Sequence, residues 1–306
     1  MPIGTSNYSY SLGTPGTQWT QVDIQDMILN LSPTDTPFFE MTGVGSSQSI
    51  RHEWQVQALE ARSVNAYLEG ADFTYTNIGT PTREVNINQI LTHGAQLSGS
   101  AEAQPYYGAR SALKHELSRR MKEHRNALEH SLIRGVLNSG DATTARQMDG
   151  VLAAANVATN AVGASLTEAG FISLAETLWL NGSSPNTVLT NSKLKNDINA
   201  FTGIGPTKYV DMPIREIITQ ILTYQTDYGT INVFLSRDMT STANATAGVE
   251  LVMFDKQMLR KDYLRPSFMK RYPEGIMDGH RASLMTELTL YYGNGTSIYH
   301  WRGMAN

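Results

Sequence analysis

The stretch YYGARSALKHELSRRMKEHRNALEHSLIRGVLNSG, residues 106–140, decides how the rest of the chain is interpreted. It contains no proline, and its apolar residues recur at helical spacing. These residues are Leu113, Leu117, Met121, Leu128, Leu132, Ile133, Val136 and Leu137. The pattern predicts one helix from Tyr106 to Asn138, roughly 50 Å long at 1.5 Å per residue. Such a long helix with a narrow apolar face indicates a supporting element whose charged flanks stay exposed.

Charge is distributed unevenly along the chain, whose net charge is -4. Residues 1–100 hold three arginines and nine acids, whereas residues 101–140 hold seven basic residues and four acids. A negative net charge argues against a dedicated nucleic-acid-binding protein. An acidic region and a basic helix favour contacts between copies of the chain. Two solvated faces explain the same distribution, so both interpretations stay open.

No motif in the chain indicates an enzyme. The absence of cysteine excludes disulfides, thiol nucleophiles and thiolate metal sites. His115, His124 and His130 lie nine and six residues apart, so they point in different directions around a helix and predict surface histidines. The pattern Ser-x-x-Lys occurs three times but lacks the companion motifs of serine acylases. We therefore expect no catalytic residue, no metal and no cofactor.

Two stretches of alternating polarity predict strands on either side of a long loop. In IRHEWQVQALE, residues 50–60, the apolar side carries Trp54 and Val56. In REVNINQIL, residues 83–91, apolar residues alternate with Glu84, Asn86 and Asn88, which predicts a polar outer side. A two-stranded ribbon is marginal by itself in water. We therefore expect this ribbon to rest on something else.

The other stretches predict an arm, a mixed α/β region and a closing hairpin. Residues 1–20 lack periodicity and predict an arm, followed by a short helix over Val22–Leu31. SLTEAGFISLAETLWLNG, residues 165–182, predicts a helix, and NTVLT, GTINVFLS and GVELVMFD predict strands. IREIITQIL fits either helix or strand. In RASLMTELTLYYGNGTSIYHWRG, Asn294 and Gly295 predict the turn of a hairpin.

In this order the elements resemble the HK97-like major capsid proteins of tailed phages. SPTDTPFFEMTG, before HEWQVQALEARSVNAYLEGAD, is similar to the start of one branch of that family. RQMDGVLAA and HRASLMTELTLYYGNGTSIYHWRG are similar to later parts of the same branch. The order of elements covers nearly the whole chain, while the motifs are short. The resemblance implies an α+β chain with the HK97-like capsid fold, built from an N-terminal arm, an extended β-ribbon loop, a long spine helix, and peripheral and axial domains.

The resemblance also implies how the chain divides and what it does. Residues 1–40 would form the arm, 41–104 the extended loop, 105–165 the peripheral domain with the spine helix, 166–255 the axial domain, and 256–306 the closing strands of the peripheral domain. The chain would be a major capsid protein without catalytic residues. Its copies would assemble as pentamers and hexamers into the icosahedral head shell that encloses the double-stranded DNA of a tailed phage.

The expected partners follow from the same resemblance. They are other copies of the chain, separate scaffold, decoration and portal proteins, and DNA held without sequence-specific binding. The expected location is the virion, assembled in the host cytoplasm. No membrane is expected, because no stretch approaches ~18 uninterrupted apolar residues. The candidate contacts between subunits are Trp54, Glu60, Glu69, Asp72, Phe73, Arg119, Arg120, Lys122 and Arg125.

Three other functions stay open on sequence grounds. One is another part of the virion, such as a tail or decoration protein, which would lack a spine helix beneath a long loop. A cellular protein nanocompartment has a shell of the same architecture and packages protein cargo. A hydrolase could assemble its site from residues far apart in the sequence.

Overall fold

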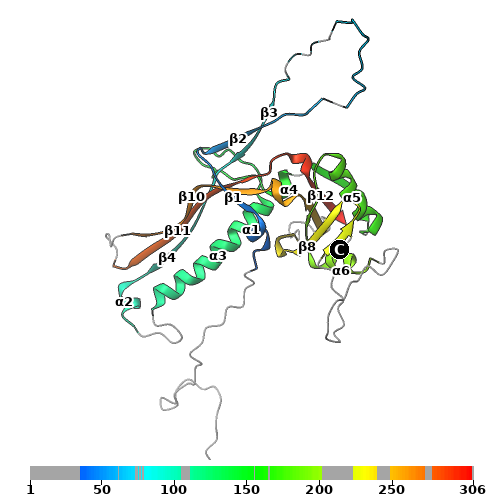
Figure 1. The fold of residues 1–306 in the computed structure, drawn as a ribbon. Helices are drawn as coiled ribbons and strands as arrows, with labels where there is room; N and C mark the ends of the chain where they lie inside the picture. The colour runs from blue at the N-terminus through cyan, green and yellow to red at the C-terminus, as the bar shows by residue number, and fades with distance from the viewer. Residues whose placement is uncertain are drawn as a thin grey trace, which may run out of the picture.

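A computed structural model of the chain contains two sheets, a long helix and a projecting ribbon (Figure 1). The structure describes residues 35–60, 62–72, 75, 77, 79–104, 111–154, 156–164, 166–201, 223–239, 249–272 and 278–304. The predicted arm over residues 1–20, the predicted helix Val22–Leu31 and the ambiguous stretch 214–222 lie outside the described residues.

The first sheet has its strands in the order β1-β10-β11-β4. The strands are β1 (Gly43–Ser46), β4 (Gln89–Leu97), β10 (Arg260–Tyr272) and β11 (His280–Tyr291). β11 pairs antiparallel with both β10 and β4, whereas the short β1 runs parallel to β10. The long helix α3 (Ala112–Arg134) packs on one face of this sheet, mainly over β4 (Figure 1). Strands from both ends of the chain therefore support the spine helix.

The second sheet has the order β5-β12-β9-β6-β8-β7. Its strands are β5 (Asn156–Ala164), β6 (Thr187–Thr190), β7 (Thr223–Thr226), β8 (Gly229–Leu235), β9 (Val249–Phe254) and β12 (Ile298–Met304). Helices α5 (Glu168–Leu180) and α6 (Ser192–Asn199) pack against it. On β9, Val252 and Phe254 belong to the core shared with α3, and Leu251 and Met253 to the core under α5 and α6. This strand, buried on both faces, joins the two cores.

The ribbon is a separate pair of antiparallel strands that leaves the body near the first sheet (Figure 1). It consists of β2 (Arg51–Val56) and β3 (Thr82–Ile87). The alternation predicted for β2 is confirmed, since every second residue from His52 to Val56 is partly buried and the others are exposed. The remaining elements are α1 (Pro37–Met41), α2 (Gly99–Glu102), α4 (Val151–Ala154), and the 3-10 turns η1 (Arg237–Met239), η2 (Lys256–Met258) and η3 (Gly295–Ser297).

The predicted long helix is confirmed, but it ends before the predicted Asn138. The Ser111 hydroxyl caps its start by accepting a hydrogen bond from the Lys114 amide at 3.5 Å. At its end the chain turns back on itself, because the Gly150 amide donates to the Gly135 carbonyl at 3.0 Å. A Cβ on Gly135 would lie 2.4 Å from the Met148 carbonyl oxygen, so the close approach requires glycine. Val136 and Leu137, predicted to extend the buried face, are exposed.

The buried face of α3 also differs in its middle. Leu117 and Leu128 are buried as predicted, but Met121 is 59% exposed. His124, predicted to lie on the surface, is only 5% exposed. At about 100° per residue, position 124 falls close to positions 117 and 128 around the helix, which places it at the centre of the packed stripe.

The predicted closing hairpin is wrong, because β11 and β12 do not pair with each other. β11 pairs with β10 and β4, whereas β12 pairs with β9 and β5 in the other sheet. The Asn294 side chain caps the turn η3 between them by accepting from the Thr296 amide at 3.1 Å. The turn predicted at Asn294 and Gly295 is present, but a turn between two strands does not determine that they pair with each other.

Strand pairing joins segments from different parts of the predicted division. β1 and β4 lie within the range 41–104 predicted for the extended loop, yet both are strands of the first sheet. The strand β12, in the range 256–306, belongs to the second sheet together with β5. Residues 51–87 therefore bound the part that projects as a ribbon.

Candidate assembly surfaces

The base of the ribbon is attached to its own subunit through Trp54. Its indole Nε1 donates a hydrogen bond to the Gly293 carbonyl oxygen at 2.5 Å. Its ring centroid lies 4.8 Å from those of both Tyr291 and Tyr292, at the end of β11. Aromatic pairs in such tilted and edge-on arrangements add to the burial energy. Trp54, a predicted contact between subunits, thus packs within its own subunit.

Two buried asparagines fix the other strand of the ribbon. The Asn86 amide nitrogen donates to the carbonyl oxygens of Leu290 at 2.7 Å and Asp149 at 3.1 Å. Its oxygen accepts from the Asp149 amide at 2.8 Å. Asn88 donates to the Ser47 hydroxyl at 2.8 Å. Both side chains are fully buried, so the polar outer side predicted for this strand is wrong at Asn86 and Asn88. Buried amides are stabilised by hydrogen bonds, which Asn86 makes through both its nitrogen and its oxygen and Asn88 makes through its nitrogen.

A buried carboxylate lies beneath the ribbon base. Asp262 accepts two hydrogen bonds from the Arg260 guanidinium, at 2.6 and 2.9 Å, and lies 3.1 Å from His52 Nε2. Gly45 on β1 covers this group, and a Cβ there would lie 2.1 Å from an Asp262 oxygen. The contact joins β2 to both strands at one side of the first sheet, so the ribbon leaves the body from a fixed base.

The tip of the ribbon has the opposite character. Its predicted acidic contacts, Glu60, Glu69 and Asp72, are all exposed. Its large apolar side chains are exposed as well, at 95% for Leu59, 85% for Leu68 and 90% for Tyr75. Phe73 lies outside the described residues. Within one subunit the tip combines negative charge with apolar surface that nothing in the described structure covers.

The basic flanks of the spine helix are largely paired within the subunit. Arg119 and Arg120 both form ion pairs with Glu116 and Glu123 on the same helix, at distances from 2.7 to 3.5 Å. Arg125 pairs with Glu40 and donates to the Thr36 hydroxyl at 2.7 Å. Exposed pairs at this spacing contribute only about 0.3–0.5 kcal/mol each to stability. They nevertheless reduce the positive charge that this surface can offer to a neighbour.

A second basic surface lies on the face of the first sheet that points away from α3. Because Thr286 contacts α3, the next residue, Glu287, points to the opposite face. There the buried Glu287 carboxylate pairs with Arg146, and with Arg265 at 2.6 Å. The neighbouring positions along β10 and β11 carry the exposed Lys270, Arg281, Phe268 and Tyr272. We call this set of residues, with Arg146 and Arg265, the far face; it carries more cations than acids.

The short helix α1 is held at one end by the spine helix and at the other by β10. The carboxylate of Glu129 accepts from the amides of Phe38 at 3.0 Å and Phe39 at 2.6 Å. Burial raises the pKa of Glu129 to about 7, although these hydrogen bonds act to lower it. At the other end, the buried Lys261 amine donates to the Phe39 carbonyl and to the Thr42 carbonyl at 3.1 Å. Both charges match the helix dipole.

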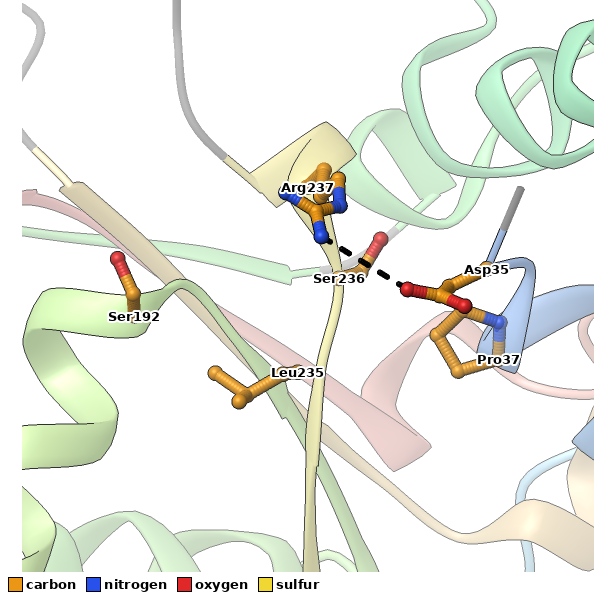
Figure 2. Close-up of a pocket in the computed structure, with 6 residues that line it drawn as sticks. All are labelled: Asp35, Pro37, Ser192, Leu235, Ser236 and Arg237. Atoms are coloured by element: carbon orange, nitrogen blue, oxygen red, sulfur yellow. Dashed lines mark ion pairs between the residues drawn. The ribbon is translucent and has the colours of Figure 1, made fainter. Parts of the chain in front are cut away.

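A hollow of about 450 Å³ lies between α1 and the start of α6 (Figure 2). Arg237 and Asp35 face each other across it at 3.8 Å, and both are exposed. Ser192, which begins one of the Ser-x-x-Lys patterns, lines it. The matching Lys195 is buried and donates to the Val233 carbonyl at 3.4 Å. Lys195 is therefore not among the residues that line the hollow beside Ser192.

The described residues offer neither a cluster of metal ligands nor a membrane-spanning helix. They contain no group of three or more His, Asp or Glu side chains that could hold a metal ion. Among them, no helix has the length and apolar character needed to cross a membrane.

Comparisons with known proteins place the chain among capsid sequences. Residues 5–303 match a family described as SU10 major capsid protein. A major capsid protein of Escherichia phage Phieco32 is 33% identical over 106 residues, which is 34% of this chain. The aligned stretch spans 30% of the length of that relative.

Solved structures share the fold at low sequence identity. The capsid of a native GTA particle has a TM-score of 0.63 at 13% identity, over 97% of this chain and 100% of the other. The encapsulin of a holo-SrpI complex from Synechococcus elongatus has a TM-score of 0.59 at 10% identity, over 94% of each chain. The predicted HK97-like fold is confirmed, but phage shells and an encapsulin share it, so the fold alone does not separate them.

Proposed function

This chain belongs to the SU10 major capsid protein family, and from that premise we propose that its copies build the DNA-filled head shell of a tailed phage. Pentamers and hexamers of the chain form an icosahedral shell, and the enclosed double-stranded DNA is held without base-specific contacts. The contrast between the two ends of the ribbon is the observation that best supports this proposal. Its base is folded into its own subunit, whereas its tip exposes Leu59, Leu68 and Tyr75, which a second copy can bury.

The far face is the partner surface that best suits the ribbon tip. The tip carries Glu60, Glu69 and Asp72, and the far face carries the exposed Lys270 beside the exposed Phe268 and Tyr272. The spine helix is the weaker candidate, because Arg119, Arg120 and Arg125 already have acidic partners. Of its predicted contacts, Lys122 has no ion pair with another described residue. Complementary charge sets the orientation of such a contact, and apolar burial supplies most of its affinity.

Charge reversal tests which surface receives the tip. Glu69→Lys and Lys270→Glu should each reduce the yield of shells, and the double variant should restore it. Lys122→Glu is the matched control, because it makes the same change on an exposed lysine of the spine helix. If Lys122→Glu, and not Lys270→Glu, restores assembly of Glu69→Lys, then the spine helix is the partner surface.

A second experiment separates the phage shell from the nanocompartment. The chain is isolated from infected or expressing cells, imaged by negative stain, and treated with nuclease. Closed particles that protect double-stranded DNA are expected. Particles that instead retain a stoichiometric protein cargo and no protected DNA would support the nanocompartment, and a stable monomer at high concentration would contradict both shells.

A further inference from the structure

Two histidines from different elements face each other beneath the spine helix. Nδ1 of His93, on β4, lies 3.1 Å from Nδ1 of His124, on α3, and the two rings are inclined by 80°. His124 Nε2 lies 2.7 Å from the Thr286 hydroxyl on β11, which in turn lies 2.7 Å from the Ser267 hydroxyl on β10. Four polar side chains thus connect the helix to three strands of the first sheet.

The contact between the two Nδ1 atoms requires one proton between them. One ring must donate and the other must accept, so the uncharged pair forms a hydrogen bond. One added proton can reside on the outer nitrogen of His93, which is partly exposed, and this leaves the bond intact. A second added proton must go onto the accepting Nδ1 of His124. It would place two N–H groups and two positive charges against each other at 3.1 Å.

No described charge is placed to compensate that second proton. The stretch Gln89–Leu97 contains no other titratable residue. On α3, Arg120 and Glu123 pair with each other at 2.8 Å. On β11, Glu287 points to the far face, where it forms ion pairs with Arg146 and with Arg265, the latter on β10. Burial, and then the neighbouring His93, lower the pKa of His124.

The two halves of α3 depend on this contact to different degrees. The half after His124 packs into the main core through Leu128, Leu132 and Ile133. The half before it rests on a small cluster, which is Leu113, Leu117, Ala95 and Ala282. Since apolar burial is the main source of packing energy, the first half has less to hold it when the histidine contact is lost.

We propose that His93 and His124 form a proton-sensitive joint, which fixes the first half of α3 to the sheet and releases it when both rings are protonated. The sign follows from the chemistry of the pair. Because the pKa of His124 is lowered on folding, the unfolded or released state takes up more protons as the pH falls below 6.5. The joint is therefore closed above that pH and opens progressively below it. The inference concerns one subunit and does not depend on the proposed shell function.

Amide hydrogen exchange of the full chain at pH 7.5 and pH 5 tests the joint. After correction for intrinsic exchange rates, protection of residues 112–123 should fall at pH 5, by a factor on the order of ten, because the released state takes up a proton that the closed joint excludes. Protection of residues 128–134 should not change. His93→Gln should reduce the pH dependence in residues 112–123, because glutamine can bond to His124 but cannot become charged, so only the effect of burial on His124 remains.

His115→Gln is the control, since it removes a histidine from the same half of the helix without touching the pair. It should leave the pH response of the native chain unchanged. The proposal is overturned if the native chain shows equal protection at the two pH values, or if His93→Gln responds to pH as the native chain does. The comparison of the native chain at the two pH values needs no variant. It therefore still tests the proposal if His93→Gln does not fold.

Discussion

The base and the tip of the ribbon belong to one hairpin, yet they have opposite relations to their own subunit. At the base, Trp54, Asn86 and Asn88 bond to the backbone of the body and are wholly or partly buried. At the tip, Leu59 and Leu68 stand in solvent at 95% and 85% exposure. The base is thus part of the folded subunit, whereas the tip has surface suited to a partner.

Because of this difference, one end of the ribbon contributes to the free energy of folding and the other to the free energy of assembly. Changes at the base should alter the stability of the subunit, because they remove contacts that form on folding. Changes to Leu59 and Leu68 at the tip should alter assembly far more than folding, because both side chains are almost fully exposed in the subunit. The spine helix, by contrast, uses one residue stripe for folding and pairs its charged flanks locally.

The largest effect on subunit stability is expected from Trp54→Ala. Removing a large aromatic side chain with its hydrogen bond should lower the free energy of unfolding by about 3 kcal/mol. Urea unfolding of the unassembled subunit measures this. Trp179→Ala is the control. Because Trp179 is 54% exposed, its removal should lower the free energy of unfolding much less. Equal losses in the two variants would contradict the anchoring role of Trp54.

Asn86→Ala should have the next largest effect. It leaves the Leu290 and Asp149 backbone groups buried without their partner, at a cost of about 2 kcal/mol. The matched control is Asn77→Ala near the tip, where the side chain is exposed and the change should stay within about 0.5 kcal/mol. If the two asparagine variants unfold at the same denaturant concentration, the base is not anchored as described.

The double variant Leu59→Ser, Leu68→Ser should leave the unfolding free energy within about 0.5 kcal/mol of the native value. It should nevertheless abolish shells in sedimentation, because both side chains lose the apolar burial that a second copy offers. Limited proteolysis provides a second readout: residues 67–82 should be cut in free subunits and protected in native shells. Shells formed by the variant with native yield would rule out the tip as an assembly element.

The last prediction concerns covalent links between subunits, and here no effect is expected: particles boiled in detergent should separate into single chains. The first lysine of the chain is Lys114, so neither the base nor the tip offers an amine for an isopeptide bond, and cysteine is absent. Arginine, the cation of the ribbon, stays protonated and is a poor nucleophile. Gel electrophoresis should therefore show one band at the mass of a single chain, and a ladder of larger bands would show covalent links from another source.

Sequence reasoning succeeded where the signal is local. The helix over Glu168–Leu180 follows from its apolar spacing and from Thr167, whose hydroxyl accepts from the Gly170 amide at 3.2 Å. The alternation in β2 and the long proline-free helix are also properties of neighbouring residues. The acidic, exposed ribbon tip could be predicted for the same reason. The order of these elements was enough to identify the capsid resemblance that the family comparison confirmed.

Tertiary structure alone decided which distant segments meet. Asn86 and Asn88 alternate with apolar residues as an exposed face would, and only the backbone of Leu290 and the loop at Ser49 make them buried. The hairpin predicted around Asn294 failed because β12 found partners in β9 and β5. The helical spacing of His124 matches that of Leu117 and Leu128, but only the fold shows that His93 of β4 lies against it. Spacing along a chain fixes direction around a helix or strand, but partners far along the chain fix burial, charge pairing and sheet membership.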